Sequence, residues 1–301
     1  MSKFLSFGSL NLDYTYRVEH FVRAGETLAA SEVQTFCGGK GLNQSVALAK
    51  AGAEVYHAGC IGSDGTLLLE ELKRAKVNTD FVRVLEREKT GHAIIQNTQD
   101  GENCILLFGG ANRCITKEQI DSTLAHFGSG DILVLQNEIN LIEYCIQSAK
   151  RKGMRIAFTP APMRQAVLEY PLSQVDYILL NETEAKALVA ADIDTQPDKI
   201  ALADALSERY PEVHFVFTLG AEGVMYIYKQ ERIFQSAFPV HAVDTTAAGD
   251  TFAGFFLQSM AAGEGVGKAL ETASKAAAIC VTNRGAAPSI PTAAQIAQRE
   301  W

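Results

Sequence analysis

A turn of small residues that ends in a carboxylate is the feature of the sequence with the clearest chemical potential. It reads DTTAAGD over residues 244–250 and leads into an apolar helix expected over residues 252–260. Small residues let the backbone N–H groups of Ala247, Ala248 and Gly249 converge on one anion at a helix N-terminus, where the helix dipole adds to their effect. A phosphoryl group during transfer is such an anion. Asp250 falls in the first turn, where its carboxylate either takes part in chemistry or only caps the helix.

A second glycine-rich turn, GGKGLN over residues 38–43, precedes another expected helix. Its glycines permit close approach of a backbone, and Lys40 and Asn43 supply one cation and one amide that can bind hydroxyl groups. The turn is neither a Walker A loop, which needs Ser or Thr after the lysine, nor a GxGxxG dinucleotide fingerprint. From the residues alone, it is either a ligand-binding loop or a plain connection.

Two further turns follow apolar strands. The run NETE ends one strand, so Asn181 and Glu184 should lie at the carboxyl edge of a sheet, where open α/β folds bind ligands. Their Asn-x-x-Glu spacing fits a capping box, and their oxygens also suit hydrated Mg²⁺, so both interpretations stay open. The turn that contains Thr218, Gly220 and Gly223 either contacts nucleotide phosphates or is only structural.

Short apolar strands alternate with helical patterns along the chain, and this alternation predicts a parallel sheet. Strand-like runs at residues 4–7, 132–135 and 177–180 precede expected helices at residues 43–51, 141–150 and 183–189. Because the strands are apolar at successive positions, helices should cover both faces of the sheet. We therefore predict a doubly wound, three-layer α/β sandwich.

Two segments, at about residues 12–37 and 90–110, break this alternation. In the second, two apolar runs flank Asp100-Gly101, as in a β-hairpin. Both segments can form a small antiparallel sheet that stands off the main body, and sheets of this kind often serve as lids. We therefore predict a single α/β domain over residues 1–301 with a small antiparallel β lid.

The composition excludes several classes of protein. Thirty-five acidic residues against 27 Lys and Arg give a net charge of −8, which disfavours nucleic-acid binding. The six cysteines are scattered without a CxxC pair, so neither a disulfide framework nor a zinc site is indicated, and a reducing cytoplasm fits. No signal peptide and no run of about 18 apolar residues is found, so we expect a cytoplasmic protein that does not span a membrane.

Taken together and in order, the segments resemble the PfkB carbohydrate kinase family, and within it the ribokinase branch, almost from end to end. Besides the four turns above, the resemblance includes GSLNLD at residues 8–13 and GAN at residues 110–112. Six ordered motifs are far more specific than any one of them. The resemblance implies a ribokinase-like fold and ATP-dependent phosphorylation of a sugar, with D-ribose to D-ribose 5-phosphate as the first expectation. Other substrates, namely 2-deoxyribose, fructose or adenosine, stay open.

The resemblance also implies the roles of individual residues. Asp250 would take the proton of the sugar hydroxyl late in the transfer, while the amides of residues 247–249 meet the phosphoryl charge. The implied sugar-binding residues are Asn11, Asp13, Gly39, Lys40, Asn43 and Glu138. Asn181 and Glu184 would organise Mg²⁺ and the phosphates, Glu184 without direct ligation. A K⁺ activator would be bound, mostly through backbone oxygens, by Asp244, Thr246, Cys280, Asn283, Gly285 and Ser289.

Pairing of two lids would protect the edges of the small sheet, so a homodimer is expected from the resemblance. Two other classes fit less well. A non-catalytic sugar-binding protein would have no use for Asp250 at an anion site and is usually exported. A nicotinamide dehydrogenase shares the doubly wound sheet but needs a GxGxxG fingerprint after its first strand, where this chain has GSLNLD.

Overall fold

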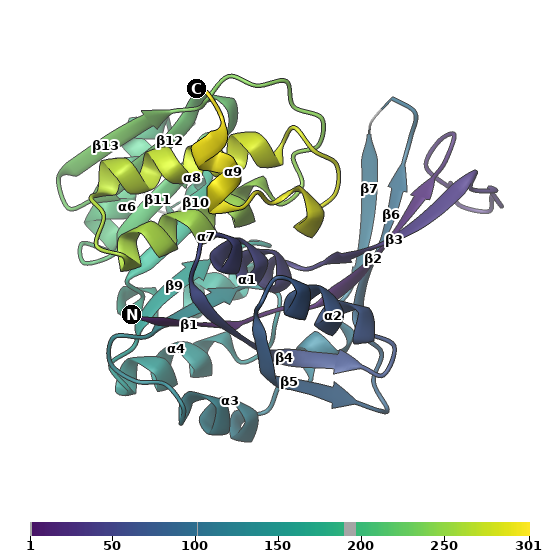
Figure 1. Cartoon of the computed structure of the whole chain (residues 1–301), viewed down its shortest axis with the longest axis horizontal. Helices are drawn as coiled ribbons and strands as arrows, with labels where there is room; N and C mark the ends of the chain where they lie inside the picture. The colour runs from purple at the N-terminus through teal and green to yellow at the C-terminus, as the bar shows by residue number, and fades with distance from the viewer. Residues whose placement is uncertain (1, 101, 190–196) are drawn as a thin grey trace.

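Nine strands form one large sheet in the order β13-β12-β11-β10-β9-β8-β1-β4-β5 (Figure 1). The computed structural model describes residues 2–100, 102–189 and 197–301. Strands β11 to β5 run parallel, and β12 and β13 add an antiparallel edge. The strands are β1 Lys3–Phe7, β4 Glu54–Gly62, β5 Asn78–Leu85, β8 Ile132–Gln136, β9 Arg155–Thr159, β10 Tyr177–Asn181, β11 His214–Thr218, β12 Gly223–Tyr228 and β13 Glu231–Ser236.

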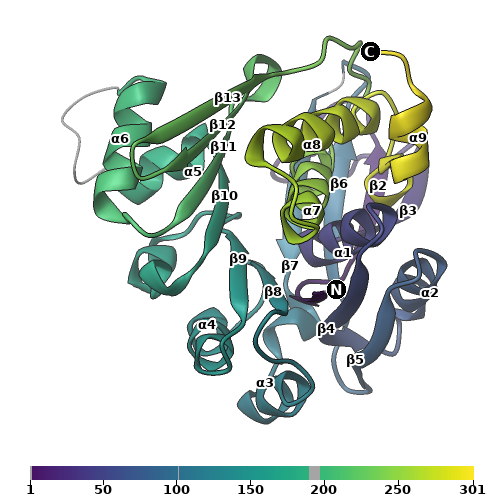
Figure 2. The ribbon, with the colours of Figure 1, turned by 60° about the vertical axis from the view of Figure 1, so that its left-hand side comes forward.

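Helices cover both faces of this sheet, as the unbroken apolar runs of its strands predict (Figure 2). In β1, Leu5 and Phe7 belong to one buried cluster and Phe4 belongs to the other, because successive side chains of a strand point to opposite faces. The first cluster includes residues of α3 Lys117–Leu124, α4 Ile142–Arg151, α5 Glu182–Val189 and α6 Lys199–Arg209. The second includes residues of α1 Lys40–Lys50, α2 Thr66–Arg74, α7 Ala248–Ala261, α8 Val266–Cys280 and α9 Ala293–Gln298. The predicted doubly wound sandwich is confirmed.

A second sheet of four strands, in the order β3-β2-β6-β7, stands away from the main body (Figure 1). Its strands are β2 Asn11–Arg17, β3 Glu32–Gly38, β6 Gly91–Asn97 and β7 Asn103–Phe108. The outer pairs β2–β3 and β6–β7 are antiparallel, whereas the central pair β2–β6 is parallel. The hairpin expected around Asp100 is present as β6 and β7, and Gly101 lies outside the described residues.

The helix that carries Asp250 begins earlier than the sequence suggests. It was expected from residue 252, but α7 starts at Ala248, because Ala247 adopts a left-handed backbone conformation with φ 62° and acts as the N-cap. Asp250 therefore lies in the first turn of α7, as predicted. Within the described ranges, no helix combines the length and hydrophobicity that a membrane span requires.

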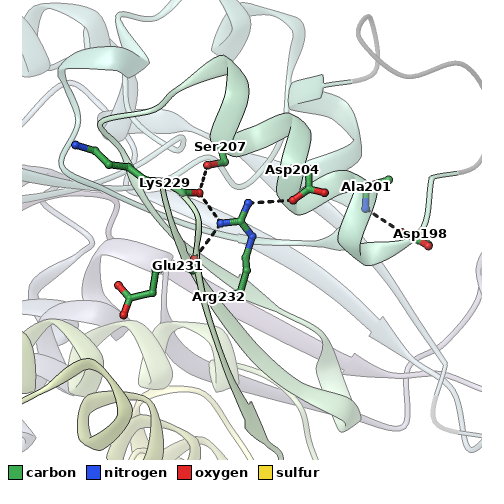
Figure 3. A network of polar contacts seen from close by, with 7 residues as sticks. All are labelled: Asp198, Ala201, Asp204, Ser207, Lys229, Glu231 and Arg232. Atoms are coloured by element: carbon green, nitrogen blue, oxygen red, sulfur yellow. Dashed lines mark hydrogen bonds and ion pairs between the residues drawn. The ribbon is translucent and has the colours of Figure 1, made fainter.

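The turn between β12 and β13 is tied to α6 by the side chain of Arg232 (Figure 3). The Arg232 guanidinium donates to the carbonyl oxygens of Lys229 at 2.6 Å and Glu231 at 2.9 Å. It also donates to the carboxylate of Asp204 at 3.0 Å, and the Ser207 hydroxyl donates to the Lys229 carbonyl as well. One side chain thus joins the edge hairpin to a helix of the body.

Replacing Arg232 with Ala should lower the free energy of unfolding by about 1 kcal/mol, because three hydrogen bonds are lost at a partly exposed position. Urea unfolding of Arg232→Ala and of the parent measures the difference. Arg232 does not line the cavity described below, so the turnover number should stay unchanged. A loss of turnover at full stability would contradict this structural role.

Candidate active site

A cavity of about 1130 Å³ lies where the carboxyl ends of the parallel strands meet the small sheet. Thr159, Asn181 and Thr218 line it from the last positions of β9, β10 and β11. Asn11 and Asp13 line it from the other side, since every second residue of β2 faces the cavity. Open α/β sheets bind ligands at this edge, and the cavity gathers segments that are far apart in the chain.

Asp250 lines this cavity, and the residue is buried, with 6% of its surface exposed. Its Oδ1 accepts a hydrogen bond from Nε2 of Gln44 at 3.0 Å, and its Oδ2 accepts one from Nδ2 of Asn43 at 3.1 Å. The carboxylate is therefore held by side chains of α1 and is not bonded to the amides of its own helix. This favours chemistry over capping, the alternative that the sequence left open.

The backbone before Asp250 presents amides to the same cavity, which residues 247–249 also line. In the part of the chain that the structure describes, the N–H groups of Ala247 and Gly249 donate to no protein acceptor. The N–H of Ala248 donates to the Thr245 carbonyl at 3.2 Å, so it is less available than the sequence suggested. Two free amides at the N-terminus of α7 remain for an anion.

The structure brings all six expected sugar-binding residues to the wall of the cavity; they are Asn11, Asp13, Gly39, Lys40, Asn43 and Glu138. The glycine turn packs directly against the backbone that follows β1. Gly39 has φ 93°, and a Cβ on Gly41 would lie 2.4 Å from the amide nitrogen of Ser9. The Glu138 carboxylate accepts hydrogen bonds from the Ser9 hydroxyl and, at 3.0 Å, from the Lys40 backbone N–H. The turn, the end of β1 and the end of β8 are thus held together.

The polar groups of this wall offer both donors and acceptors to a ligand. Oδ1 of Asn43 is buried and has no hydrogen-bond partner among the described residues. The side chain of Asn11 is fixed, because its Oδ1 accepts from Nδ2 of Asn112 at 2.7 Å. Fixed amides and carboxylates of this kind suit a ligand with several hydroxyl groups.

Lys40 supplies positive charge beside the acidic side chains of the site. The negative charge of Asp250 raises the pKa of Lys40 although burial opposes this, and the charges of Glu138 and Glu184 add to the rise. Lys40 therefore stays protonated at neutral pH, and an anionic ligand that enters beside Asp250 meets a cation.

Burial, together with the charge of Glu138, raises the pKa of Asp13 from its ordinary value of 3.8 to about 7. The folded protein then holds this proton at pH values where the unfolded chain has released it. The contribution of Asp13 to stability is therefore complete below pH 3.8 and is lost as the pH rises to about 7.

Replacing Asp13 with Asn, which stays neutral, should raise the melting temperature by about 3 °C at pH 8 and by much less at pH 4. Thermal unfolding of both proteins across this pH range measures the effect. The matched control is Asp80→Asn, an exposed position outside the cavity, which should leave the melting temperature almost unchanged. A gain in melting temperature from Asp13→Asn that is larger at pH 4 than at pH 8 would contradict the predicted loss of stability with rising pH.

Asn181 and Glu184 form the capping box that their spacing fits. The Glu184 carboxylate accepts from the Asn181 backbone N–H at 3.0 Å and from its Nδ2 at 3.2 Å, and the Asn181 Oδ1 accepts from the Glu184 N–H at 2.9 Å. Both residues also line the cavity, and burial raises the pKa of Glu184. The capping interpretation is therefore observed, and it places a carboxylate beside the ligand space.

The two segments expected to bind a monovalent cation lie next to each other. The Asp244 carboxylate accepts from the Thr246 N–H at 2.9 Å and from the Gly285 N–H at 2.9 Å. All three residues line the cavity. The Asp244 carboxylate supplies hard oxygen donors, which fit a cation of this class.

Five of the expected residues do not line the cavity: Gly220, Gly223, Cys280, Asn283 and Ser289. The Cys280 thiol and the Ser289 hydroxyl lie 3.0 Å apart in the interior, and the Asn283 amide donates to the Ile279 carbonyl at 2.9 Å. Gly223 has a backbone role instead, since a Cβ there would lie 2.1 Å from the Gln235 carbonyl oxygen on β13.

Among the residues missed from the sequence are two that fix side chains of the site. Gln44 bonds Asp250 directly, and Asn112 fixes Asn11 and also accepts from the Leu10 N–H at 2.9 Å. The GAN motif already contained Asn112, so the available signal was a polar residue that closely follows two glycines. For Gln44, the only signal in the sequence was its position next to Asn43.

Comparison with known proteins gives a consistent family. The chain matches the family described as pfkB family carbohydrate kinase over residues 1–293. It is 36% identical over 289 residues to a protein named ribokinase from Haemophilus influenzae, covering 95% of this chain and 94% of that protein. It is 33% identical to a ribokinase from Staphylococcus aureus, with 99% of both proteins covered.

Solved structures agree with this relationship. The crystal structure of ribokinase from Thermotoga maritima superposes with a TM-score of 0.87 at 34% identity, covering 99% of this chain and 98% of that one. The structure of Arabidopsis thaliana ribokinase complexed with ribose and ATP superposes with a TM-score of 0.86 at 29% identity, covering 99% of this chain and 97% of that one. The ribokinase-like fold is thereby confirmed, and the chain belongs to the pfkB family of carbohydrate kinases.

Proposed function

We propose that this kinase transfers the γ-phosphoryl group of ATP to the 5-hydroxyl of D-ribose, giving D-ribose 5-phosphate and ADP, with Asp250 as the base. The observation that carries the proposal is the meeting of two features in one cavity. A buried carboxylate lies beside free amides at the start of α7, and a set of hydroxyl-binding side chains lines the same space. Several relatives named ribokinase, and the Arabidopsis structure with ribose and ATP, support the choice of substrates.

In this mechanism, Asp250 orients the hydroxyl and takes its proton late. An aspartate has an ordinary pKa near ~4, so removing the proton of a sugar hydroxyl before attack would be uphill by many kcal/mol. In a loose phosphoryl-transfer transition state, the attacking oxygen needs little negative charge. Asp250 therefore holds the oxygen in line with phosphorus and accepts the proton as the new O–P bond forms and the bond to ADP breaks.

The charge of the transferred phosphoryl group would be met by donors that are already in place. These are the N–H groups of Ala247 and Gly249, together with the ammonium of Lys40. Preorganised donors in a site shielded from water usually supply a large part of catalysis. Because water is the competing nucleophile, we propose that the four-stranded sheet acts as a lid that closes over the sugar.

Mg²⁺ would be held mainly by the phosphates of ATP and by water, with Glu184 and Asn181 nearby. Within the described ranges, no group of three His, Cys, Asp or Glu side chains could form a metal cage, so we assign Glu184 an indirect role through water. When bound, Mg²⁺ neutralises phosphate charge. K⁺ would be held near Asp244, Thr246 and Gly285 and would act as an activator by fixing the turn before α7.

The same resemblance leads us to propose a cytoplasmic homodimer that pairs two small sheets. Strand β7 supports this, because it is an edge strand on which the apolar side chains of Leu106 and Phe108 are exposed and do not line the cavity. Exposed apolar edges usually need cover in a soluble protein.

The proposal is tested by ADP release from MgATP, with and without K⁺, in the presence of ribose, 2-deoxyribose, fructose or adenosine. Ribose should give the highest kcat/KM, and K⁺ should raise it. Ribose-independent ADP release, or a clear preference for another acceptor, would contradict the substrate assignment. The most specific rival is 2-deoxyribose, because a protein named deoxyribokinase from Salmonella typhi is 30% identical over 293 residues.

A further inference from the structure

We propose that Gln44 is a positioning residue that holds the Asp250 carboxylate from the interior of the protein. The inference rests on the proposed transfer, in which Asp250 accepts the proton. Gln44 is 1% exposed and does not line the cavity, whereas its neighbour Asn43 does. Asn43 thus holds Oδ2 of Asp250 from the ligand side at 3.1 Å, and Gln44 holds Oδ1 from behind at 3.0 Å.

The hydrogen bonds around Gln44 allow only one orientation of its amide. An ionised carboxylate can only accept, so Nε2 of Gln44 must face Asp250. The opposite atom, Oε1, then accepts from Nε2 of Gln136 at 2.8 Å, while Nε2 also donates to the Thr159 hydroxyl at 3.2 Å. Gln136 is fully buried at the end of β8. A directed chain of hydrogen bonds therefore runs from Gln136 through Gln44 to Asp250.

A helix contact one turn further along sets the distance between α1 and α7. Gly254 follows Asp250 by four residues, and Ala47 follows Asn43 by four. A Cβ on Gly254 would lie 2.5 Å from Cβ of Ala47 and 2.7 Å from the amide nitrogen of Leu48. The helices therefore approach as closely as their backbones permit, which brings the short amide side chains of α1 within reach of Asp250.

Rotation of the Asp250 carboxylate would move the atom that must receive the proton. Holding a catalytic group in its productive geometry accounts for a large part of rate enhancement, and small displacements can cost up to about 100-fold. Because Gln44 touches neither the cavity nor its ligands, its loss should lower kcat and leave KM unchanged.

The first test replaces Gln44 with Met, which has similar length and no hydrogen-bonding amide. We expect kcat to fall by about 30-fold, with KM for the sugar and for ATP within about twofold of the parent. The matched control is Gln119→Met. Gln119 is an equally buried glutamine that does not line the cavity, and it donates a hydrogen bond of 2.9 Å to the Gly59 carbonyl. The control should lose stability and keep its kinetic constants. An unchanged kcat in Gln44→Met would overturn the proposal.

A second variant separates positioning from a merely structural role. Gln44→Glu places another carboxylate next to Asp250, so the pair shares one proton and its upper apparent pKa rises. The acidic limb of the kcat profile should then move to higher pH by about one unit or more. Ionisable groups that interact electrostatically with Asp250 include Lys40 on α1, Glu184 on α5 and Cys280 on α8, and all are retained in the variant. An unshifted limb would contradict the proposal.

Unfolding in urea gives a readout that does not depend on substrate. Gln44→Met and Asp250→Ala, made singly and together, should give non-additive losses of stability, because both remove the same hydrogen bond. If the parent phosphorylates no acceptor, the proposed function fails and this cycle alone decides the positioning contact. Additive losses of stability would then overturn the proposed contact between Gln44 and Asp250, and non-additive losses would support it.

Discussion

Replacing Asp250 with Asn is expected to lower kcat by about 1,000-fold, because the amide cannot accept the proton of the sugar hydroxyl. The side chain keeps its size, and Asn43 and Gln44 remain beside it, so the fold should be retained. Residual activity is expected because free amides and Lys40 still stabilise the phosphoryl charge. Steady-state ADP release measures kcat, and calorimetry measures ATP affinity, which should change little.

The matched control for this experiment is Asp204→Asn. Asp204 accepts a hydrogen bond from Arg232 at 3.0 Å and does not line the cavity, so its loss should leave kcat unchanged. If Asp250→Asn were as active as the parent while Asp204→Asn also stayed active, another group would have to be the base. Loss of ATP binding in Asp250→Asn would instead indicate a binding role.

Replacing Gly254 with Ala should lower the free energy of unfolding by about 3 kcal/mol, since overpacking a tight helix contact forces backbones apart. The added Cβ would meet Ala47 and Leu48 at distances that the present helix spacing does not permit. Separation of α1 from α7 would also lengthen the bonds to Asp250, so kcat should fall in the protein that remains folded.

The same substitution at Gly267 provides the contrast for Gly254→Ala. Gly267 lies in α8 with no atom near its expected Cβ position, so Gly267→Ala should be neutral or stabilising by up to about 1 kcal/mol. Urea unfolding of both variants measures the difference. Equal effects at the two positions would show that the helix contact at Gly254 does not limit the approach of α1 and α7.

Features that depend on local residue order were predictable from the sequence. Consecutive apolar residues such as Phe4 and Leu5 indicated strands covered on both faces, and the structure assigns them to opposite buried clusters. Turns that follow strands in such a sheet must meet at its carboxyl edge. It was the resemblance to the family that implied a shared site for Asn11, Asn43 and Asp250, and the cavity contains all three.

Features that depend on long-range register were not predictable. The bond from Gln44 to Asp250 joins residues 206 positions apart, and it exists because two helices touch at Gly254. Gly223 is needed because its backbone pairs closely with Ser236 of β13, and no local sequence pattern indicates this pairing. Similarly, the parallel pairing of β2 with β6 links segments that lie far apart in the chain. Such contacts follow from packing rather than from residue types at short spacing.

The central claim is most directly tested by ³¹P NMR of the product formed from ribose and MgATP. A phosphomonoester on the primary 5-hydroxyl couples to two methylene protons, so the account predicts a triplet in the proton-coupled spectrum, together with one ADP per ester. A doublet would place the phosphoryl group on a carbon that bears one proton and contradict the assigned position. Inorganic phosphate without an ester would mean that ribose is not the acceptor.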